Sequence, residues 1–329
     1  MSVVGKAWAP LQRRAAAGHV AGARLLDALA VGRELGRRGI RTTIGYWDRS
    51  GEPAEQVAAV CLEAVRAIPA RPVGTADCYL SIKVPSLGFD AGLIGELLAV
   101  GAERGVALHY DAKAPEAADA TFALLDAGPP FAPRPGCTLP GGWVRSPADA
   151  ERVRDLGGRV RVVKGQWLDP AERFSARGLR SGCLEVVDRL AGRSGLVAIA
   201  THDGALAAEA LGRLVAAGTP CELELLYGLG AGGVLRATRR LAVPVRVYIP
   251  FGQAYLPYPL WRVGSEPRLA RYLAGDLLGR RAARGGGQVR SYAGSLTTSR
   301  DGGAEPAQVR SAGGEASPTG GSRARRPVP

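Results

Sequence analysis

The chain has 329 residues, 46% of them hydrophobic, and a formal net charge of +13 at pH 7. This length suits one large α/β domain, since a barrel of eight β/α units takes about 250 residues. No apolar run approaches the roughly 20 residues of a transmembrane helix. The N-terminus carries no secretory signal, and the five scattered cysteines form no CxxC pair. These features argue against secreted and integral membrane proteins, and we expect a cytoplasmic protein.

The positive charge is concentrated near the end of the chain. Residues 280–329 carry nine arginines against three acidic residues, and Gly, Pro or Ser fill 20 of the 50 positions. Such a segment buries too little apolar surface to offset the entropy cost of ordering it. We therefore expect a disordered basic tail over 280–329. Because the tail lacks interleaved aromatic side chains, we expect no specific nucleic-acid partner.

The preceding sequence alternates strand-like and helix-like segments. The first 40 residues predict a helical N-terminal extension without strands. Strands are predicted at 41–47, 78–86, 107–112, 136–140, 159–167, 195–203, 221–228 and 243–250. Helices are predicted at 57–68, 91–104, 115–127, 147–156, 179–191, 205–217, 232–241 and 267–278. Ser146, just before Pro147, predicts a helix N-cap followed by a first-turn proline.

Strands that alternate with helices predict a parallel sheet, because parallel strands need crossover connections. Eight such units over 41–279 fit a closed (β/α)8 TIM-type barrel best. An open doubly wound sheet is the alternative, but the GxGxxG fingerprint after a first strand is missing. The predicted domains are an extension over 1–40, a barrel over 41–279 and the tail over 280–329.

Charged residues gather at the predicted carboxyl ends of the strands, where barrel enzymes carry their chemistry. They are Lys83, Asp111, Arg161, Lys164, Glu222 and Glu224, joined by Thr201, His202, Asp203 and Tyr248. We expect Lys83, Arg161 and Lys164, set against Asp111, to form a cationic ring that suits an anionic ligand, either a carboxylate or a phosphate. Any one of these residues could equally be an ordinary solvated strand end. The three histidines show no metal-binding spacing and no GxSxG elbow is present, so we expect no metal site and no serine nucleophile.

Several of these segments resemble motifs of the proline dehydrogenase family. Residues 161–167, RVVKGQW, resemble the family's RLVKGAYW, and residues 200–203, ATHD, resemble its ATHN. Residues 222–229, ELELLYGL, are similar to EFQMLYGM, and residues 246–252, RVYIPFG, to RVYVPYG. Residues 258–262 resemble the start of the PYLVRR helix, and Ser81–Lys83 and Asp111–Ala112 match the second and third strands. The motifs follow the family's order with family-like spacing.

The resemblance implies a flavoenzyme that oxidises L-proline to Δ1-pyrroline-5-carboxylate with non-covalent FAD at the barrel mouth. It implies catalytic roles for Asp111 and Arg161, with Arg161 also beside the flavin. The other implied cofactor contacts are Ala112, Lys164, Gly165, Gln166, Thr201 and His202. The implied substrate contacts are Lys83 and Arg262 for the carboxylate and Tyr248 and Tyr258 for the ring. A quinone or another acceptor would then take the electrons, with at most peripheral contact at the inner membrane face. Because 329 residues are too few to add the aldehyde dehydrogenase module of the bifunctional relatives, we expect a divergent, monofunctional member of bacterial type.

The sequence also departs from the family pattern. Trp261 replaces the first of two adjacent arginines, which removes half of the expected carboxylate clamp. The other departures are Pro140, Trp167, Asp203, Glu224 and Ser265. Losing one of two charge-assisted contacts costs on the order of 1.5–3 kcal/mol. Two alternatives therefore stay open: oxidation of a different cyclic or secondary amine, and a degenerate non-catalytic flavin barrel.

Overall fold

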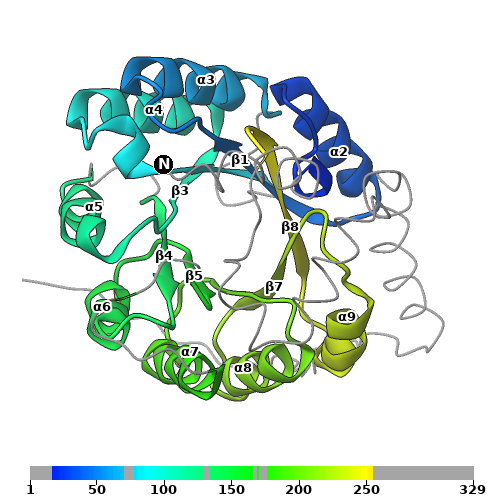
Figure 1. Ribbon diagram of the computed structural model, residues 1–329. Helices are drawn as coiled ribbons and strands as arrows, with labels where there is room; N and C mark the ends of the chain where they lie inside the picture. The colour runs from blue at the N-terminus through cyan, green and yellow to red at the C-terminus, as the bar shows by residue number, and fades with distance from the viewer. Residues whose placement is uncertain (1–16, 70–77, 129–133, 166–168, 170–175, 255–329) are drawn as a thin grey trace, which may run out of the picture.

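The computed structural model describes residues 17–69, 78–128, 134–165, 169 and 176–254. Eight parallel strands form a closed barrel in sequence order, and β8 (Val245–Gly252) pairs with β1 (Arg41–Trp47) (Figure 1). Helices surround this barrel on its outside. The prediction of a (β/α)8 TIM-type barrel is therefore confirmed.

All eight predicted strands are present, but several are shorter at their carboxyl ends. The remaining strands are β2 (Cys78–Ile82), β3 (Ala107–Tyr110), β4 (Gly136–Pro140), β5 (Val160–Val163), β6 (Val197–Ala200) and β7 (Cys221–Leu226). The chain leaves β2 into a 3-10 turn, η2 (Val84–Leu87), because Pro85 has no N–H to continue the ladder. After β5, Gly165 adopts a left-handed φ of 81°. The polar strand-end residues thus lie in turns at the barrel mouth.

The outer layer consists of α2 (Leu25–Arg37), α3 (Ala54–Ala67), α4 (Ala91–Arg104), α5 (Ala118–Asp126), α6 (Ser146–Val153), α7 (Ala176–Leu190), α8 (Gly204–Ala216) and α9 (Gly232–Thr238). Short 3-10 turns are η1 (Ala17–His19), η3 (Pro115–Ala117) and η4 (Arg239–Leu241). Helix α2 of the predicted extension packs on β1 and β8 through Leu25 and Leu29 (Figure 1). The helix predicted over 267–278 and the tail over 280–329 lie outside the described residues.

The prediction of an N-cap at Ser146 is wrong. Helix α6 begins at Ser146 itself, and the Ser146 hydroxyl donates a 2.6 Å hydrogen bond to the Pro140 carbonyl at the end of β4. The side chain is buried, so a neighbouring carbonyl at the strand end competes for it better than the helix's own N–H groups. Ser146 therefore ties α6 to the barrel mouth.

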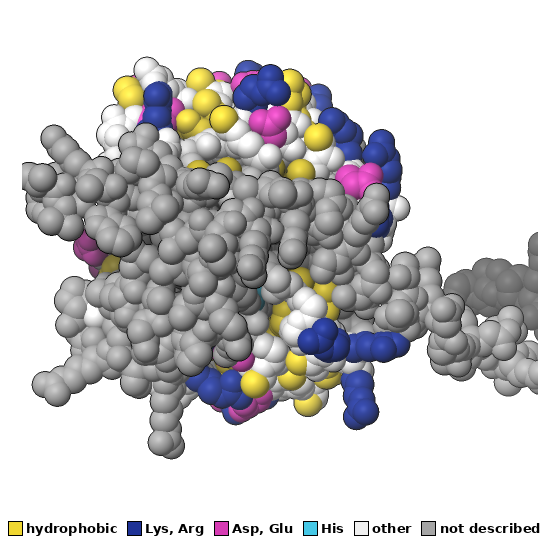
Figure 2. Space-filling model, turned by 45° about the vertical axis from the view of Figure 1, so that its right-hand side comes forward, with side chains coloured by type: hydrophobic (Ala, Val, Ile, Leu, Met, Phe, Trp, Pro, Cys, Tyr) yellow, Lys and Arg dark blue, Asp and Glu magenta, His cyan; other side chains and the backbone are white. Residues whose placement is uncertain are grey.

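Two kinds of core lie on opposite sides of the sheet. Outward-facing strand residues such as Val160 and Val162 pack with the helices in one continuous apolar core. The barrel interior instead holds charged side chains. On the outer surface, acidic side chains are interspersed among the lysines and arginines of the face in Figure 2. Among the described residues, no helix has the length and apolar character needed to cross a membrane.

Candidate active site

Arg161 on β5 lies buried at the centre of the barrel mouth, where Glu224 of β7 holds it. The guanidinium Nε and Nη2 donate hydrogen bonds of 2.9 Å each to the two carboxylate oxygens of Glu224. Nη1 donates to Asp111, which follows β3. Burial disfavours the charged form of Arg161, but Glu224 and Asp111 outweigh it and raise the pKa of Arg161. Arg161 is therefore a permanently charged group in a fixed orientation.

Tyr248 on β8 closes one side of this site. Its hydroxyl donates a 3.0 Å hydrogen bond to Asp111 Oδ2, and the Arg161 guanidinium lies 5.2 Å from the ring centroid. Burial and the Asp111 carboxylate raise the pKa of Tyr248 well above its usual value. The ring occupies space above Gly45 of β1, where a Cβ would overlap the Tyr248 hydroxyl. Glycine at this interior position thus makes room for the tyrosine.

A second charged layer lies below the first, toward the amino ends of the strands. Glu222 of β7 accepts hydrogen bonds from Arg246 of β8 (2.7 Å) and from Arg159 (3.1 Å). Arg159 also donates to Glu224, so the two layers are linked. Burial would raise the pKa of Glu224, but Arg159 and Arg161 outweigh it and lower that pKa strongly. Each buried carboxylate is thus compensated by arginines, as burial of charge requires.

His109 of β3 is wholly buried beside these arginines. Its Nε2 lies 2.8 Å from Thr138 Oγ1, and Thr138 donates a long, 3.5 Å hydrogen bond to Asp111. Burial, reinforced by Arg161, lowers the pKa of His109 well below its usual value. The neutral ring is therefore a hydrogen-bonding support beneath Asp111 rather than a proton donor near pH 7.

Lys83 at the end of β2 belongs to a second cluster on the rim of the mouth. Its ammonium lies 3.4 Å from Asp48 Oδ1 and donates to the Tyr46 carbonyl. Ser86 donates a 2.8 Å hydrogen bond to the other Asp48 oxygen, and Lys113 lies 3.8 Å from that oxygen. Burial opposes ionisation of Asp48, but Lys83 outweighs it and the pKa of Asp48 is lowered. The acidic neighbour of Lys83 is thus Asp48, while Asp111 pairs with Arg161.

The loops after β5 and β6 form a third part of the mouth. Lys164 lies 3.4 Å from Asp203, which also caps the N-terminus of α8. The His202 ring links two backbone groups: Nε2 accepts from the Leu226 N–H at 2.9 Å, and Nδ1 lies 3.1 Å from the Gly230 carbonyl. This position makes His202 a brace between the loops after β6 and β7. Thr201 accepts a 3.1 Å hydrogen bond from the Asp203 N–H.

The structure brings most of the predicted site residues to one end of the barrel. Those at the mouth are Lys83, Asp111, Ala112, Arg161, Lys164, Gly165, Thr201, His202 and Tyr248. Gln166, Tyr258 and Arg262 lie outside the described residues, as does Trp261. The expected excess of cations is offset, because carboxylates lie within 4 Å of Lys83, Arg161 and Lys164.

The described residues fit a flavin at this mouth. A Cβ at Gly165 would lie 2.9 Å from the Pro140 side chain, so glycine lets the turn that holds Arg161 and Lys164 pack closely against the end of β4. These two side chains supply fixed N–H donors and positive charge, which suit an electron-rich ring with carbonyl groups. On the neighbouring strand β6, Ala198 and Ala200 have short side chains, so they take up little space at this side of the mouth.

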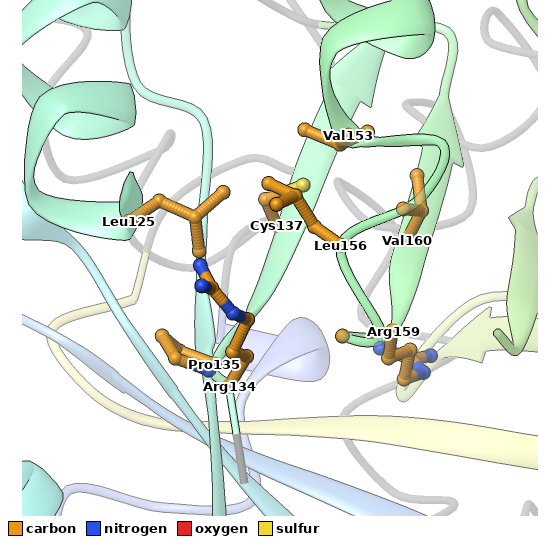
Figure 3. A pocket seen from close by; sticks show the side chains of 9 residues that line it. Leu125, Arg134, Pro135, Cys137, Val153, Leu156, Arg159 and Val160 are labelled. Carbon is orange, nitrogen blue, oxygen red and sulfur yellow. The ribbon is translucent and has the colours of Figure 1, made fainter. Parts of the chain in front are cut away.

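A separate pocket lies at the opposite end of the barrel, near the amino ends of β4 and β5 (Figure 3). It is lined by Leu125, Arg134, Pro135, Cys137, Val153, Leu156, Gly158, Arg159 and Val160. Its volume is about 10 Å³, which is room for roughly one water molecule. Burial raises the pKa of the Cys137 thiol to about 12, so this thiol is unreactive. The pocket is a packing gap rather than a ligand site.

Comparison with known proteins points to one family. No family model matches the chain. It is 26% identical over 276 residues to "Proline dehydrogenase 1" of Bacillus subtilis subsp. natto, covering 79% of this chain and 89% of that protein. It is 25% identical over 275 residues to the protein of the same name from B. subtilis strain 168, with the same coverage. These similarities support the proline dehydrogenase family.

Solved structures agree with the barrel. Proline utilization A from Bdellovibrio bacteriovorus, inactivated by N-propargylglycine, has a TM-score of 0.63 at 14% identity, over 86% of this chain and 33% of that one. A proline utilization A structure with proline bound in remote sites has a TM-score of 0.56 at 16% identity, over 82% and 32%. The chain thus spans about a third of these proteins, and at this identity the likeness shows the fold alone.

Three residues at the mouth were missed as site residues by the sequence reasoning. Glu224 was noted as a strand-end charge and as a departure from the family pattern, but not as a site residue, yet it holds Arg161. Asp48 directly follows β1, and Lys113 lies three residues beyond β3, so their position after a strand was a usable signal. That these side chains lie close to their partners could not be predicted from the sequence, because it depends on how loops after different strands fold together.

Proposed function

We propose that this protein is an FAD-dependent proline dehydrogenase-like enzyme that oxidises L-proline to Δ1-pyrroline-5-carboxylate. The observation that carries the proposal is the fixed Arg161 guanidinium, held by Glu224 and Asp111 at the carboxyl end of β5. It lies in one of the segments that resemble motifs of the proline dehydrogenase family. The sequence similarity to two proline dehydrogenases and the barrel fold support the same reaction class.

FAD, when bound, would supply the two-electron acceptor: the proline ring carbon next to nitrogen would give up a hydride, and the nitrogen would lose a proton to solvent as the C=N bond forms. Arg161 would stabilise negative charge that develops beside it. Lys164, Gly165, Gln166, Ala112, Thr201 and His202 would hold the cofactor, with His202 acting through the loops that it braces.

The substrate would lie between the two charged groups of the mouth. Lys83 and Arg262 would bind its carboxylate, because a positive charge orients a carboxylate and raises affinity. Tyr248 and Tyr258 would form apolar walls for the ring and exclude water. Asp111, fixed by Tyr248 and Arg161, would face the amine as the acidic catalytic residue. A small cyclic amino acid offers both the carboxylate and the amine that this arrangement requires.

The remaining assignments follow from the same family. A quinone or another acceptor would take the electrons, in a cytoplasmic protein with at most peripheral contact at the inner membrane face. We keep the division into an extension over 1–40, a catalytic barrel over 41–279 and a basic tail over 280–329. Helix α2 of the extension would then serve to cover β1 and β8.

Anaerobic titration tests the proposal. The purified chain should show the absorbance of bound oxidised flavin, and L-proline should bleach it while D-proline should not. A yellow protein that L-proline leaves oxidised would contradict proline as substrate and favour another cyclic or secondary amine, as Trp261 suggests. A colourless protein that cannot be reconstituted with FAD would overturn the enzyme assignment.

A further inference from the structure

The rim cluster around Asp48 contains more positive charge than its carboxylate can balance. Lys83 and Lys113 reach opposite oxygens of the same Asp48 carboxylate, at 3.4 and 3.8 Å. The loops after β2 and β3 therefore bring two ammonium groups to one carboxylate, and these three groups together carry +1. Like charges held this close repel each other, and a second anion between them offsets that cost.

Both lysines are held in place rather than left to move through solvent. Lys83 donates to the Tyr46 carbonyl, and Lys113 donates a 3.0 Å hydrogen bond to the Ser86 hydroxyl. Ser86 in turn donates to Asp48 at 2.8 Å. Side-chain exposures of 20% for Lys83 and 34% for Lys113 leave both within reach of a small ligand, whereas Asp48 is only 11% exposed. The anchoring carboxylate is thus more deeply buried than the two cations.

The cluster also lies next to the proposed reaction centre. Lys113 follows Asp111 by two residues in the same loop, and Asp111 contacts both Arg161 and Tyr248. Lys83 directly follows β2, the strand that pairs with β3. An anionic group bound by the two lysines would therefore present the rest of a small molecule to Asp111.

We propose that Lys113 joins Lys83 in binding the carboxylate of the substrate, and that Asp48 is the positioning residue that gathers the two lysines. This rests on the proposed function for the identity of the substrate, but the anion site stands on the geometry of the rim. Lys113 would supply from the β3 loop a cation of the kind that the sequence lacks at Trp261. The expected ligand is a small monocarboxylate, because one further negative charge would neutralise the net +1 of the cluster.

Binding of an unreactive acid tests this directly. Cyclopentanecarboxylate carries the ring and the carboxylate without an amine, and cyclopentanecarboxamide is its neutral counterpart. Calorimetric titration of the full chain at pH 7 and low salt should show that Lys113→Gln weakens binding of the acid roughly tenfold, as expected for one charge-assisted contact. Lys83→Gln should do the same and Lys113→Arg should retain most affinity, while the amide should bind all variants equally.

Arg49→Gln is the matched control, since it removes one positive charge next to Asp48 in sequence. Arg49 is 69% exposed and pairs with Glu52 at 3.7 Å, so its loss should leave the acid's affinity unchanged. Full affinity in Lys113→Gln, an equal loss in Arg49→Gln, or no binding of the acid to the unaltered protein would overturn the proposal. If the acid binds through Lys113 but L-proline does not bleach the bound flavin, the proposed reaction is contradicted and the anion site is supported.

Discussion

The Glu224 carboxylate holds the Arg161 guanidinium in a fork of two hydrogen bonds, each 2.9 Å long. Two parallel bonds fix the plane of the guanidinium as well as its position. Asp111 contacts the remaining nitrogen, so one arginine of β5 connects the ends of β3 and β7. The orientation of Arg161 is therefore decided by two carboxylates that are distant in sequence.

Glu224→Gln should impair flavin reduction and stability together. The fork loses its negative charge, while Arg159 and Arg161 stay buried, and breaking a buried ion pair costs about 3–5 kcal/mol. Urea denaturation would measure the loss of unfolding free energy. Glu222→Gln is the control, because Glu222 is equally buried but pairs in the lower layer with Arg246. It should destabilise the protein while leaving the rate of flavin reduction nearly unchanged; equal rate losses in both would contradict a specific role for Glu224.

Gly45→Ala should disturb the barrel mouth from the side of β1. The new Cβ would overlap the Tyr248 hydroxyl, so the ring must move away from Asp111. Such overpacking costs about 1–3 kcal/mol and should appear as a lower Tm. Gly36→Ala in α2 is the control, since a Cβ there meets nothing within 4 Å, and it should leave the Tm unchanged or raise it. An unchanged Tm in Gly45→Ala would contradict the close approach of Tyr248.

Arg193→Met should destabilise the end of the barrel away from the site. The buried Arg193 guanidinium donates to the backbone carbonyls of Arg154 (3.0 Å) and Gly158 (2.9 Å), before β5. Methionine keeps much of the side-chain volume but leaves these carbonyls unpaired, at a cost of about 2–3 kcal/mol. Arg37→Met, an exposed change, should stay within about 0.5 kcal/mol. Chemical denaturation of both variants measures the difference, and equal values would contradict the structural role of Arg193.

His109 should make stability depend on pH on the acidic side of neutrality. Its pKa is lowered in the folded protein by burial and by Arg161, whereas in the unfolded chain it titrates near the ordinary histidine pKa of about 6.5. Below that pH the unfolded state binds a proton that the folded state does not, so the free energy of unfolding falls as the pH falls. Above it, the contribution is constant.

Substitution of His109 tests whether this residue causes the pH dependence of the free energy of unfolding. His109→Gln keeps a polar group near Thr138 but removes the titrating ring, so it should flatten the decline in stability that begins near pH 6.5. Carboxylates with lowered pKa values, such as Glu224, add their own decline only at lower pH. Urea denaturation at a series of pH values measures both. An unchanged slope in His109→Gln would assign the decline to other groups.

The barrel was predictable because its signals are local. Each strand is a short apolar run bounded by turns, and each helix has its own apolar face, such as Val57, Cys61 and Ala64 in α3. Strand ends were less predictable: the strands predicted to run to 86 and 167 end at Ile82 and Val163, close to Pro85 and Gly165, whose local effect was not weighed. The cap at Ser146 was mispredicted because a carbonyl from another element, Pro140, competes for its hydroxyl.

The order of eight β/α units, the charged residues at the strand ends and the resemblance to proline dehydrogenases could all be predicted from the sequence. These properties depend on periodicity and motif spacing, that is, on residues close together in the chain. Which charges meet became known only from the folded barrel: Glu224 with Arg161, and Asp48 with Lys83 and Lys113. Such pairings depend on barrel closure and on the paths of loops from different strands. A buried charge is stable only beside its partner, so the closed fold decides which charges are compensated and which attract a ligand.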